Sequence, residues 1–385
     1  MRKILHQKIA LVDFAVLLFG FVDTFYIYIA SSYFADIIGS PNVGFFFLVS
    51  YIGSLVVFFC LQPVIRILGR ARTLYLFLLL SLALVALLSN TEPTYFSGLI
   101  LLFFIVTSSV LWVIFDILLE EFSENSLTGS IRGLNLTMLS FGVLMAPLLA
   151  TATLRSYGYS GVFLAMLIFY VLLFIFCLIA FRNVTGRNLP KIAFWHALSL
   201  VRKEKALWQS YVLSFSLYFF YAVMIIYMPL YLTSLGFTFT EIGSLFTIML
   251  VPFVLVQYPL GRLADKKYGE KEILIISLLI AIASTFTMAF IGTTSYFWWA
   301  LILFVSRIGI AGLEVMKDTY FYRHIDAEQV DVISFFRTSL PVANIVVAAL
   351  ATGMLTFLPL ESVFYLASLV LTGALFIAFR MVDSQ

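Results

Sequence analysis

The feature that most constrains this chain is a series of long apolar segments that recur along the whole sequence. Each is about 20 residues long, the length that an α-helix needs to cross the hydrocarbon core of a bilayer. Hydrophobic residues make up 63% of the 385 residues and charged residues 11%, whereas soluble domains are about one quarter charged. The sequence therefore predicts a membrane protein.

The apolar segments are predicted to be twelve membrane-spanning helices, an all-α fold. In lipid every backbone N–H and C=O group must be satisfied within the segment, which favours helices, and the segments lack the alternation of barrel strands. The first segment is too long for a signal peptide and is interpreted as an uncleaved span. The predicted spans are 9–32, 43–65, 72–90, 95–119, 132–154, 159–181, 208–233, 241–261, 272–291, 295–317, 332–357 and 361–380.

Basic residues set the predicted orientation of these spans. If the spans alternate, all but two of the 23 Lys and Arg residues fall on one side; Arg155 lies on the other side and Arg307 lies within a span. The side rich in Lys and Arg is the cytoplasmic side. Both termini are therefore predicted to be cytoplasmic, in a multi-pass protein of the plasma or inner membrane.

The longest polar segment lies between the sixth and seventh spans and divides the chain into two halves. In it, Phe194, Leu198 and Val201 fall on one helical face and basic residues follow. This pattern predicts an amphipathic helix on the anionic cytoplasmic leaflet. The predicted domains are a six-helix bundle, a linker and a second six-helix bundle, at 1–182, 183–207 and 208–385.

The two halves repeat a pattern of paired carboxylates near the ends of the fourth and tenth spans. The members of each pair are four residues apart and share a helix face, and each pair is followed by an arginine at the start of the next span. A repeat of this kind is typical of secondary transporters. The residues are Asp116, Glu120 and Arg132 in the first half, and Glu314, Asp318 and Arg337 in the second.

A densely charged stretch, "GRLADKKYGEKE", follows the eighth span. Gly261, Asp265 and Lys266 match, in order, the pattern Gly-x-x-x-Asp-(Arg/Lys)-x-Gly-(Arg/Lys)-(Arg/Lys); Gly269 comes one residue late, and Glu270 replaces a basic residue. This pattern, in the loop between the second and third helices of each half, is a signature of the major facilitator superfamily. The whole chain resembles that family in its spans, its central loop and its half-repeat.

The first-half counterpart of this motif, "QPVIRILGRAR", is degenerate. It keeps Gly69 and the basic Arg70, but Gln62 and Arg66 stand where the family has Gly and Asp. The two copies of the motif are therefore expected to differ in function.

The resemblance implies two rocking bundles with alternating access, in which the motif's acid meets a helix N-terminus at the cytoplasmic face. A carboxylate is favoured there by the helix dipole. We assign this gating role to Asp265, with Arg132 as its expected partner, and expect Arg66 to pair with Asp331 or Glu328. The alternative is that these are solvated loop charges that only set topology.

Small residues in the fifth span, "GLNLTMLSFGVLMAPLLAT", follow the spacing of the family's antiporter motif, Gly-x8-Gly-x3-Gly-Pro-x2-Gly-Gly. Ala replaces the third and fourth glycines. The pattern weakly favours proton-coupled export, and ordinary close packing of small residues is the alternative. The residues are Gly133, Gly142, Ala146, Pro147 and Ala150.

Two ionisable residues fall deep inside predicted spans, where a charge needs a partner or a water-filled cavity. In the family, the helices that carry Asp23 and Arg307 line the central cavity. The resemblance therefore implies that they form a cavity pair, in which Asp23 is the protonatable coupling site and Arg307 tunes it or holds an anionic group. A fixed salt bridge without a transport role is the alternative.

Further polar residues within the spans are candidates for the proton and substrate pathway. Two of them extend a polar stripe around Asp23 on the first span, and the others lie on the aromatic-rich seventh span and on the eighth and eleventh spans. Aromatic cavities suit amphipathic or apolar cations, but contact with lipid is equally open. The candidates are Asp13, Thr24, Tyr218, Tyr221, Gln257 and Asn344.

The sequence contains no phosphate-binding loop, no nucleophile arrangement and no metal-ligand spacing among its three His and two Cys residues. We therefore predict no enzyme activity, no cofactor, no metal and no nucleic-acid partner. The predicted function is that of a monomeric secondary transporter whose partners are a small molecule, protons and membrane lipids, with proton-coupled efflux favoured. The alternatives are metabolite uptake by symport or facilitated diffusion, and a membrane enzyme or lipid-handling protein.

Overall fold

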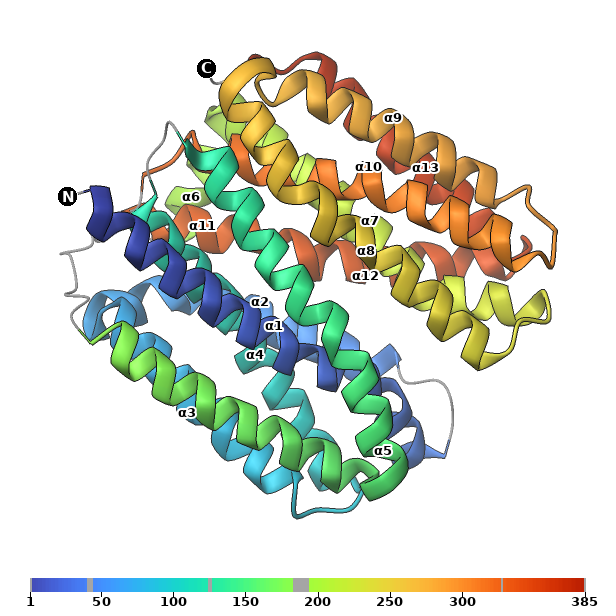
Figure 1. Ribbon diagram of the computed structural model, residues 1–385, viewed down its shortest axis with the longest axis horizontal. Helices are drawn as coiled ribbons and strands as arrows, with labels where there is room; N and C mark the ends of the chain where they lie inside the picture. The colour runs from blue at the N-terminus through green and yellow to red at the C-terminus, as the bar shows by residue number, and fades with distance from the viewer. Residues whose placement is uncertain (1, 40–43, 124–126, 183–193, 327, 384–385) are drawn as a thin grey trace. The chain divides into compact units, whose positions relative to one another are not determined.

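The computed structural model describes residues 2–39, 44–123, 127–182, 194–326 and 328–383, and every regular element within them is helical (Figure 1). The helices are α1 (Arg2–Ile38), α2 (Gly44–Leu68), α3 (Arg70–Leu88), α4 (Tyr95–Phe122), α5 (Thr128–Ala180), α6 (Phe194–Lys203), α7 (Lys205–Ser234), α8 (Phe239–Leu263), α9 (Lys271–Met288), α10 (Tyr296–Tyr322), α11 (Val330–Arg337), α12 (Ser339–Leu355) and α13 (Ser362–Phe379).

The chain forms two compact units that do not coincide with its two sequence halves. Segment 124–137, from the first half of the sequence, belongs to unit 2, and segment 327–338, from the second half, belongs to unit 1. Unit 1 comprises Met1–Ser123, Met138–Leu198 and Ala327–Thr338, and unit 2 comprises Glu124–Thr137, Ser199–Asp326 and Ser339–Gln385.

Helix α4 is the centre of the helix packing in unit 1. It contacts α1, α2, α3 and α11, and its buried side chains lie on all sides of the helix. A helix that is apolar all round is the kind that a bundle surrounds. Its first turn is fixed by a capping box, in which Thr94 and Ser97 each bond the other's backbone N–H.

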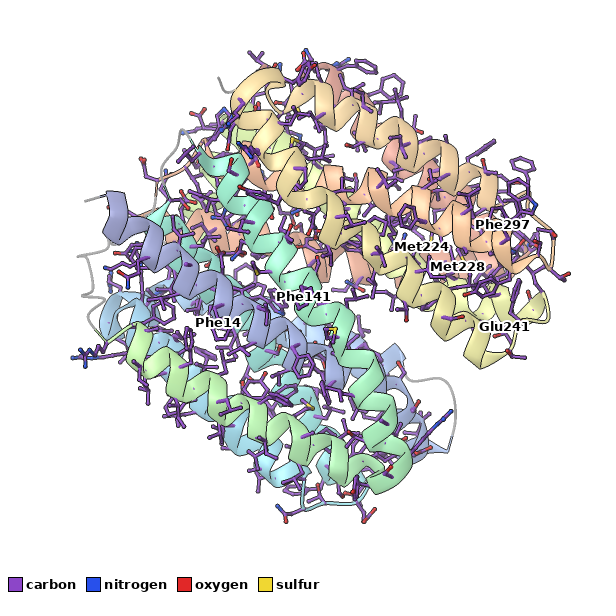
Figure 2. The ribbon with its side chains drawn as sticks, in the orientation of Figure 1. Phe14, Phe141, Met224, Met228, Glu241 and Phe297 are labelled. Carbon is purple, nitrogen blue, oxygen red and sulfur yellow. The ribbon has the colours of Figure 1, made fainter. Side chains whose placement is uncertain are left out.

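Helix α10 has the same role in unit 2. It packs against α7, α8 and α9, and α13 packs against α7 and α9; the neighbouring α9, α10 and α13 can be followed in Figure 1. The Tyr296 hydroxyl donates a 2.8 Å hydrogen bond to Ser244, which joins the starts of α10 and α8. Phe297 and Glu241 accordingly lie at the same end of the unit (Figure 2).

The chain is a multi-pass membrane protein. Within the described residues, 11 helical segments are long and apolar enough to cross a membrane. Many large apolar side chains point outward from them, as expected for helices that face lipid; examples are Phe103, Leu172, Ile225 and Leu369. The predicted total of twelve spans stays a prediction, because 132–154, in the first limb of α5, is not among these segments.

Glycine 158 breaks α5 into two limbs. Its φ of 65° and ψ of −164° are not helical, and the positive φ suits a residue without a Cβ atom. The predicted fifth and sixth spans, 132–154 and 159–181, lie on either side of this break. The sequence therefore placed the turn correctly within what is otherwise one helical element.

Several predicted spans end too early. Helix α4 extends to Phe122 rather than residue 119, and α10 extends to Tyr322 rather than residue 317. Lys317, which the sequence analysis counted among the cytoplasmic loop charges, is consequently a buried residue of α10. Charged side chains at these helix ends are held in ion pairs, Glu121 with Arg70 and Lys317 with Asp318, so a prediction from hydropathy alone ends the helices too early.

The linker is only partly described, since residues 183–193 lie outside the described residues. Helix α6 covers the rest of the predicted amphipathic segment. Val201 is buried, whereas Arg202 and Lys203 are exposed, in keeping with an apolar face and a basic face.

Candidate functional site

The start of α5 lies against the end of α8 within unit 2, and three glycines make this close approach possible. A Cβ atom on Gly261 would overlap the carbonyl group of Gly129. One on Gly133 would lie 2.7 Å from the carbonyl oxygen of Gln257. Backbones in direct contact leave no room for side chains, which explains why the charged motif begins with a glycine.

Asp265 lies at the N-terminus of α5, as the resemblance implied for the acid of this motif. Its carboxylate accepts the N–H groups of Gly129 at 2.9 Å and Ser130 at 2.6 Å. These N–H groups belong to the first turn of α5 and have no partner within the helix. The contact therefore combines two charge-assisted hydrogen bonds with the favourable end of the helix dipole.

Arg323, directly after α10, provides the positive charge for this site. Its guanidinium donates to Asp265 at 2.6 Å and also forms an ion pair with Glu270. Glu270 is fully buried, so its charge is compensated by the same arginine. We call Gly129, Ser130, Asp265, Glu270 and Arg323 the Asp265 cluster.

Sequence reasoning missed Arg323, which had been counted as a topology charge. The signal was present in Glu270, an acid where the family has a base, which requires a basic partner elsewhere. Arg132, the partner expected for Asp265, lies with its guanidinium carbon 3.2 Å from the centroid of the Tyr322 ring, a cation–π contact at the end of α10.

A π-helical turn, Ala264–Tyr268, explains why Gly269 comes one residue late in the motif. A π turn accommodates one residue more than the α-helical turn it replaces. Gly269 follows with a φ of 68°, and its first-half counterpart Gly69 has a φ of 83°. Both glycines thus have a positive φ, which a residue without a Cβ atom adopts most readily, shortly before the next helix and in spite of the different spacing.

Substitution of Gly261 by Ala is expected to lower the thermal unfolding midpoint of the purified protein in detergent. The added methyl group would meet the backbone of Gly129, which cannot rotate away, and overpacking of this kind costs about 1–3 kcal/mol. Gly243→Ala on the same helix is the matched control, because a Cβ there meets nothing within 4 Å. Equal midpoints for both variants would contradict the close contact.

In the first half, the motif supplies the basic residue of an ion pair, whereas in the second half it supplies the acids. Arg70, the first residue of α3, forms a buried ion pair with Glu121 at the end of α4. In unit 2 the loop supplies the acids and the residue after α10 supplies the base. Arg66 is exposed and, within the described residues, makes no ion pair with Asp331 or Glu328, which corrects the expected pairing. The reason is that the Arg66 side chain is exposed on the outer face of α2, whereas the Arg70 side chain is buried.

The first carboxylate pair lies where the short helix α11 packs on α2 and α4. Asp116 forms an ion pair with Arg337, and Glu120 is buried one turn further along α4. Asp331, in the first turn of α11, is also buried. Asp116, the first acid of the pair, and the later arginine of the repeat are therefore in contact, although they belong to different halves of the sequence.

Asp23 is a buried carboxylate on α1 that is held by two neutral donors of α4. The Ser108 hydroxyl donates to Oδ1, and the Trp112 indole N–H donates to Oδ2 at 3.1 Å. Only 2% of the Asp23 surface is exposed. Within the described residues of unit 1, Asp23 has no basic partner.

The rest of the predicted polar stripe on α1 has different surroundings. The Thr24 hydroxyl donates to the carbonyl of Gly20 at 2.7 Å, so it bonds its own helix. Gly20 itself lies against Leu139 of α5. Asp13 is buried. The substrate role of these residues stays a prediction.

Arg307 is buried at the middle of α10 and has only neutral neighbours. Its guanidinium lies 3.2 Å from the Met249 sulfur and 3.5 Å from the Ser306 hydroxyl, and its central carbon is 4.9 Å from the centroid of the Phe220 ring. No carboxylate pairs with it among the described residues of unit 2. The predicted pairing with Asp23 joins residues of different units and stays a prediction.

Glu314 lies beside Tyr221 and Gln257, and its predicted role in cytoplasmic gating stays a prediction. Gln257, fully buried on α8, donates a 2.8 Å hydrogen bond to Glu314, and the Tyr221 hydroxyl of α7 interacts with the same carboxylate. Its predicted partner in the acid pair, Asp318, forms an ion pair with Lys317 instead. We call Tyr221, Gln257 and Glu314 the Glu314 cluster.

Two further candidates are Tyr218 and Asn344. Tyr218 lies beside the Lys317 ammonium, 5.6 Å from the ring centroid. Asn344 donates to the carbonyl of Leu340 at 3.0 Å, so its amide N–H group bonds its own helix. A role for Asn344 in substrate contact stays a prediction.

The small residues of the fifth span are packing residues. In unit 1, a Cβ on Gly142 would overlap the carbonyl of Leu17 on α1, and Ala146 and Ala150 are fully buried. In unit 2, Gly133 meets α8 as described above. These small residues allow close helix approach, and the link of their spacing to antiport stays a prediction; the side chain of Pro147 lies outside what the structure describes.

Comparison with known proteins gives one family. The family model described as Major Facilitator Superfamily matches residues 12–316 and 232–384. No curated protein matches the sequence.

Solved structures of membrane transporters share the fold. The human organic anion transporter MFSD10 (TETRAN) is similar with a TM-score of 0.78 at 14% identity, covering 97% of this chain and 99% of that one. A bacterial homologue of the iron transporter ferroportin in the outward-facing state gives 0.76 at 15% identity, with 97% and 98% covered. The E. coli fucose:proton symporter FucP gives 0.75 at 14% identity, with the same coverage.

Proposed function

Because the chain belongs to the Major Facilitator Superfamily and is a membrane transporter rather than an enzyme, we propose that it moves a small molecule by proton-coupled alternating access. The observation that carries this proposal is that Asp23 is buried and that its described hydrogen-bond partners are neutral. A charge at this depth requires compensation, and among the described residues of unit 1 its hydrogen-bond partners are the neutral donors Ser108 and Trp112. Protonation removes that charge, so a proton taken up on one side of the membrane can be released on the other.

We propose efflux as the direction, with protons entering as the substrate leaves. The small residues of α5, which follow the spacing of the antiporter motif, support this direction. Uptake by proton symport is the second candidate, favoured by the replacement of two motif glycines by Ala146 and Ala150 and by the similarity in fold to a fucose:proton symporter.

The Asp265 cluster is the proposed gate of this transport cycle. It holds the first turn of α5 on unit 2 through two backbone N–H groups, and the remainder of α5 from Met138 onward belongs to unit 1. A change of conformation that releases this turn must break charge-assisted hydrogen bonds. The cluster is therefore suited to hold one conformation until substrate and proton provide the free energy to leave it.

A proteoliposome assay tests the coupling and the direction together. The purified protein is reconstituted with a pH-sensitive dye inside, and candidate small molecules are added with an imposed pH gradient. We expect substrate-dependent proton movement, opposite to the substrate for antiport and with it for symport. Transport that proceeds without any proton movement would replace coupled transport by facilitated diffusion.

A further inference from the structure

Arg307 differs from the other basic residues on or directly after α10. Lys317 forms an ion pair with Asp318, and Arg323 forms ion pairs with Asp265 and Glu270. Arg307 is as deeply buried as Lys317, with 3% and 1% of their surfaces exposed, but its described contacts in unit 2 are a thioether, a hydroxyl and an aromatic ring. Of these three cations, Arg307 alone lacks a carboxylate within the described residues of its unit.

Within the described residues of unit 2, the guanidinium of Arg307 meets only weak acceptors. Arginine stays charged in proteins and presents five N–H donors in a planar fork that fits a carboxylate or phosphate with two bonds. The Met249 sulfur is a weak acceptor, and the serine hydroxyl lies at the outer limit of hydrogen-bond distance. A buried cation in such surroundings is favoured only when an anion joins it for part of the cycle.

The surroundings of Arg307 define what else that anion must carry. Phe220 and Met249 line the guanidinium with an aromatic face and a polarisable sulfur, both suited to an apolar body. Glu314 lies seven residues further along α10, which places it on the same helix face about 10 Å away. Tyr221 interacts electrostatically with both Arg307 and Glu314, so the two charges have a common polar neighbour.

We propose that Arg307 binds the anionic group of the transported molecule, and that the cargo is therefore an amphipathic organic anion. Its carboxylate or other oxyanion meets the guanidinium, its apolar body lies along Phe220 and Met249, and a hydroxyl or amino group of a longer molecule reaches the Glu314 cluster. This inference rests on the proposed transport function and names its substrate class. It departs from the aromatic composition of α7, which by itself suggested cations.

Equilibrium binding tests this assignment without transport. The full-length protein is purified in detergent, and three probes of one shape are titrated by calorimetry: 4-phenylbutyrate, 4-phenylbutanamide and 4-phenylbutylamine. The wild type is expected to bind the carboxylate at least about 10-fold more tightly than the amide, as for a hydrogen bond to a charged group, and the amine most weakly. Arg307→Gln should lower the affinity for the carboxylate to that for the amide, and Arg307→Lys should retain part of the preference.

The control is Arg155→Gln, which removes an exposed arginine and should leave the order of affinities unchanged. If Arg307→Gln does not fold, the order of probe affinities of the wild type and of Arg307→Lys still tests the proposal. A wild type that prefers the amide or amine, or that binds no probe at millimolar concentration, overturns the proposal. Unchanged carboxylate affinity in a folded Gln variant also overturns it.

The same measurements separate this inference from the others. If Asp23 were the permanent counter-ion of Arg307, the wild type would show no preference for the carboxylate, and Asp23→Asn would create one. If the proposed proton coupling fails but the carboxylate preference holds, the substrate class stands and only the coupling is wrong. Carboxylate preference in the wild type together with its loss in Arg307→Gln is the supporting result.

Discussion

Replacement of Asp23 by Asn is expected to abolish uphill transport driven by a pH gradient while downhill exchange of substrate continues. The Asn side chain has nearly the same shape and can still accept from Ser108 or Trp112, but it cannot carry a proton. In proteoliposomes, accumulation against a gradient should fall to the level of empty vesicles. Counterflow of labelled substrate, which needs only the conformational cycle, should remain measurable.

The matched control for this variant is Asp36→Asn. Asp36 lies on the same helix α1, is exposed, and accepts a 2.7 Å hydrogen bond from Tyr159. This substitution also removes one carboxylate, yet it should leave uphill transport intact. Undiminished accumulation in the Asp23 variant would exclude Asp23 as the coupling residue, whatever the control shows.

Replacement of Asp265 by Asn is expected to loosen the first turn of α5. One oxygen is lost as an acceptor for the N–H groups of Gly129 and Ser130, and the charge that pairs with Arg323 is removed. Hydrogen bonds to charged groups contribute about 1.5–3 kcal/mol, so amide hydrogen exchange in this turn should be about 10- to 100-fold faster. Mass spectrometry of a peptide covering 128–137 measures this change, and the transport rate should fall with it.

Glu272→Gln provides the control for the Asp265 variant. Glu272 is an exposed acid in the first turn of α9, close in sequence and equal in charge change. Its substitution should alter neither hydrogen exchange in 128–137 nor transport. If the two variants exchange alike, the carboxylate of Asp265 does not hold the helix, and the cluster would be a set of topology charges.

The architecture was predictable because each helix in a bilayer must form its backbone hydrogen bonds internally and must be long enough to cross the hydrocarbon core. Hydropathy therefore located the helices and even the break at Gly158. It failed at helix ends that carry charges, such as the last turn of α10, because buried ion pairs allow a helix to continue where single charges would end it. Lys317 was placed in a loop for this reason.

The sequence identified many residues of the candidate site, but it did not identify the contacts that they make. Asp23 and Arg307 stood out because charges in apolar surroundings are costly and therefore few, and Asp265 stood out by its place in the charged motif. Their partners come from segments remote in the sequence, and no spacing rule identifies them. Glu314 illustrates the difference, since its four-residue spacing to Asp318 suggested a pair, whereas the fold brings it to Gln257 of another helix.

The π-helical turn before Gly269 has a consequence for aligning related chains. An added residue in an α-helix would rotate everything after it by about 100°, since each residue advances the helix by that angle. Here the wider turn absorbs the addition, and a glycine with a positive φ still precedes α9. A search with rigid spacing would score this loop as a broken motif. An alignment that opens a one-residue gap between Asp265 and Gly269 would recover it, so a length difference here is a change in winding rather than the loss of the motif.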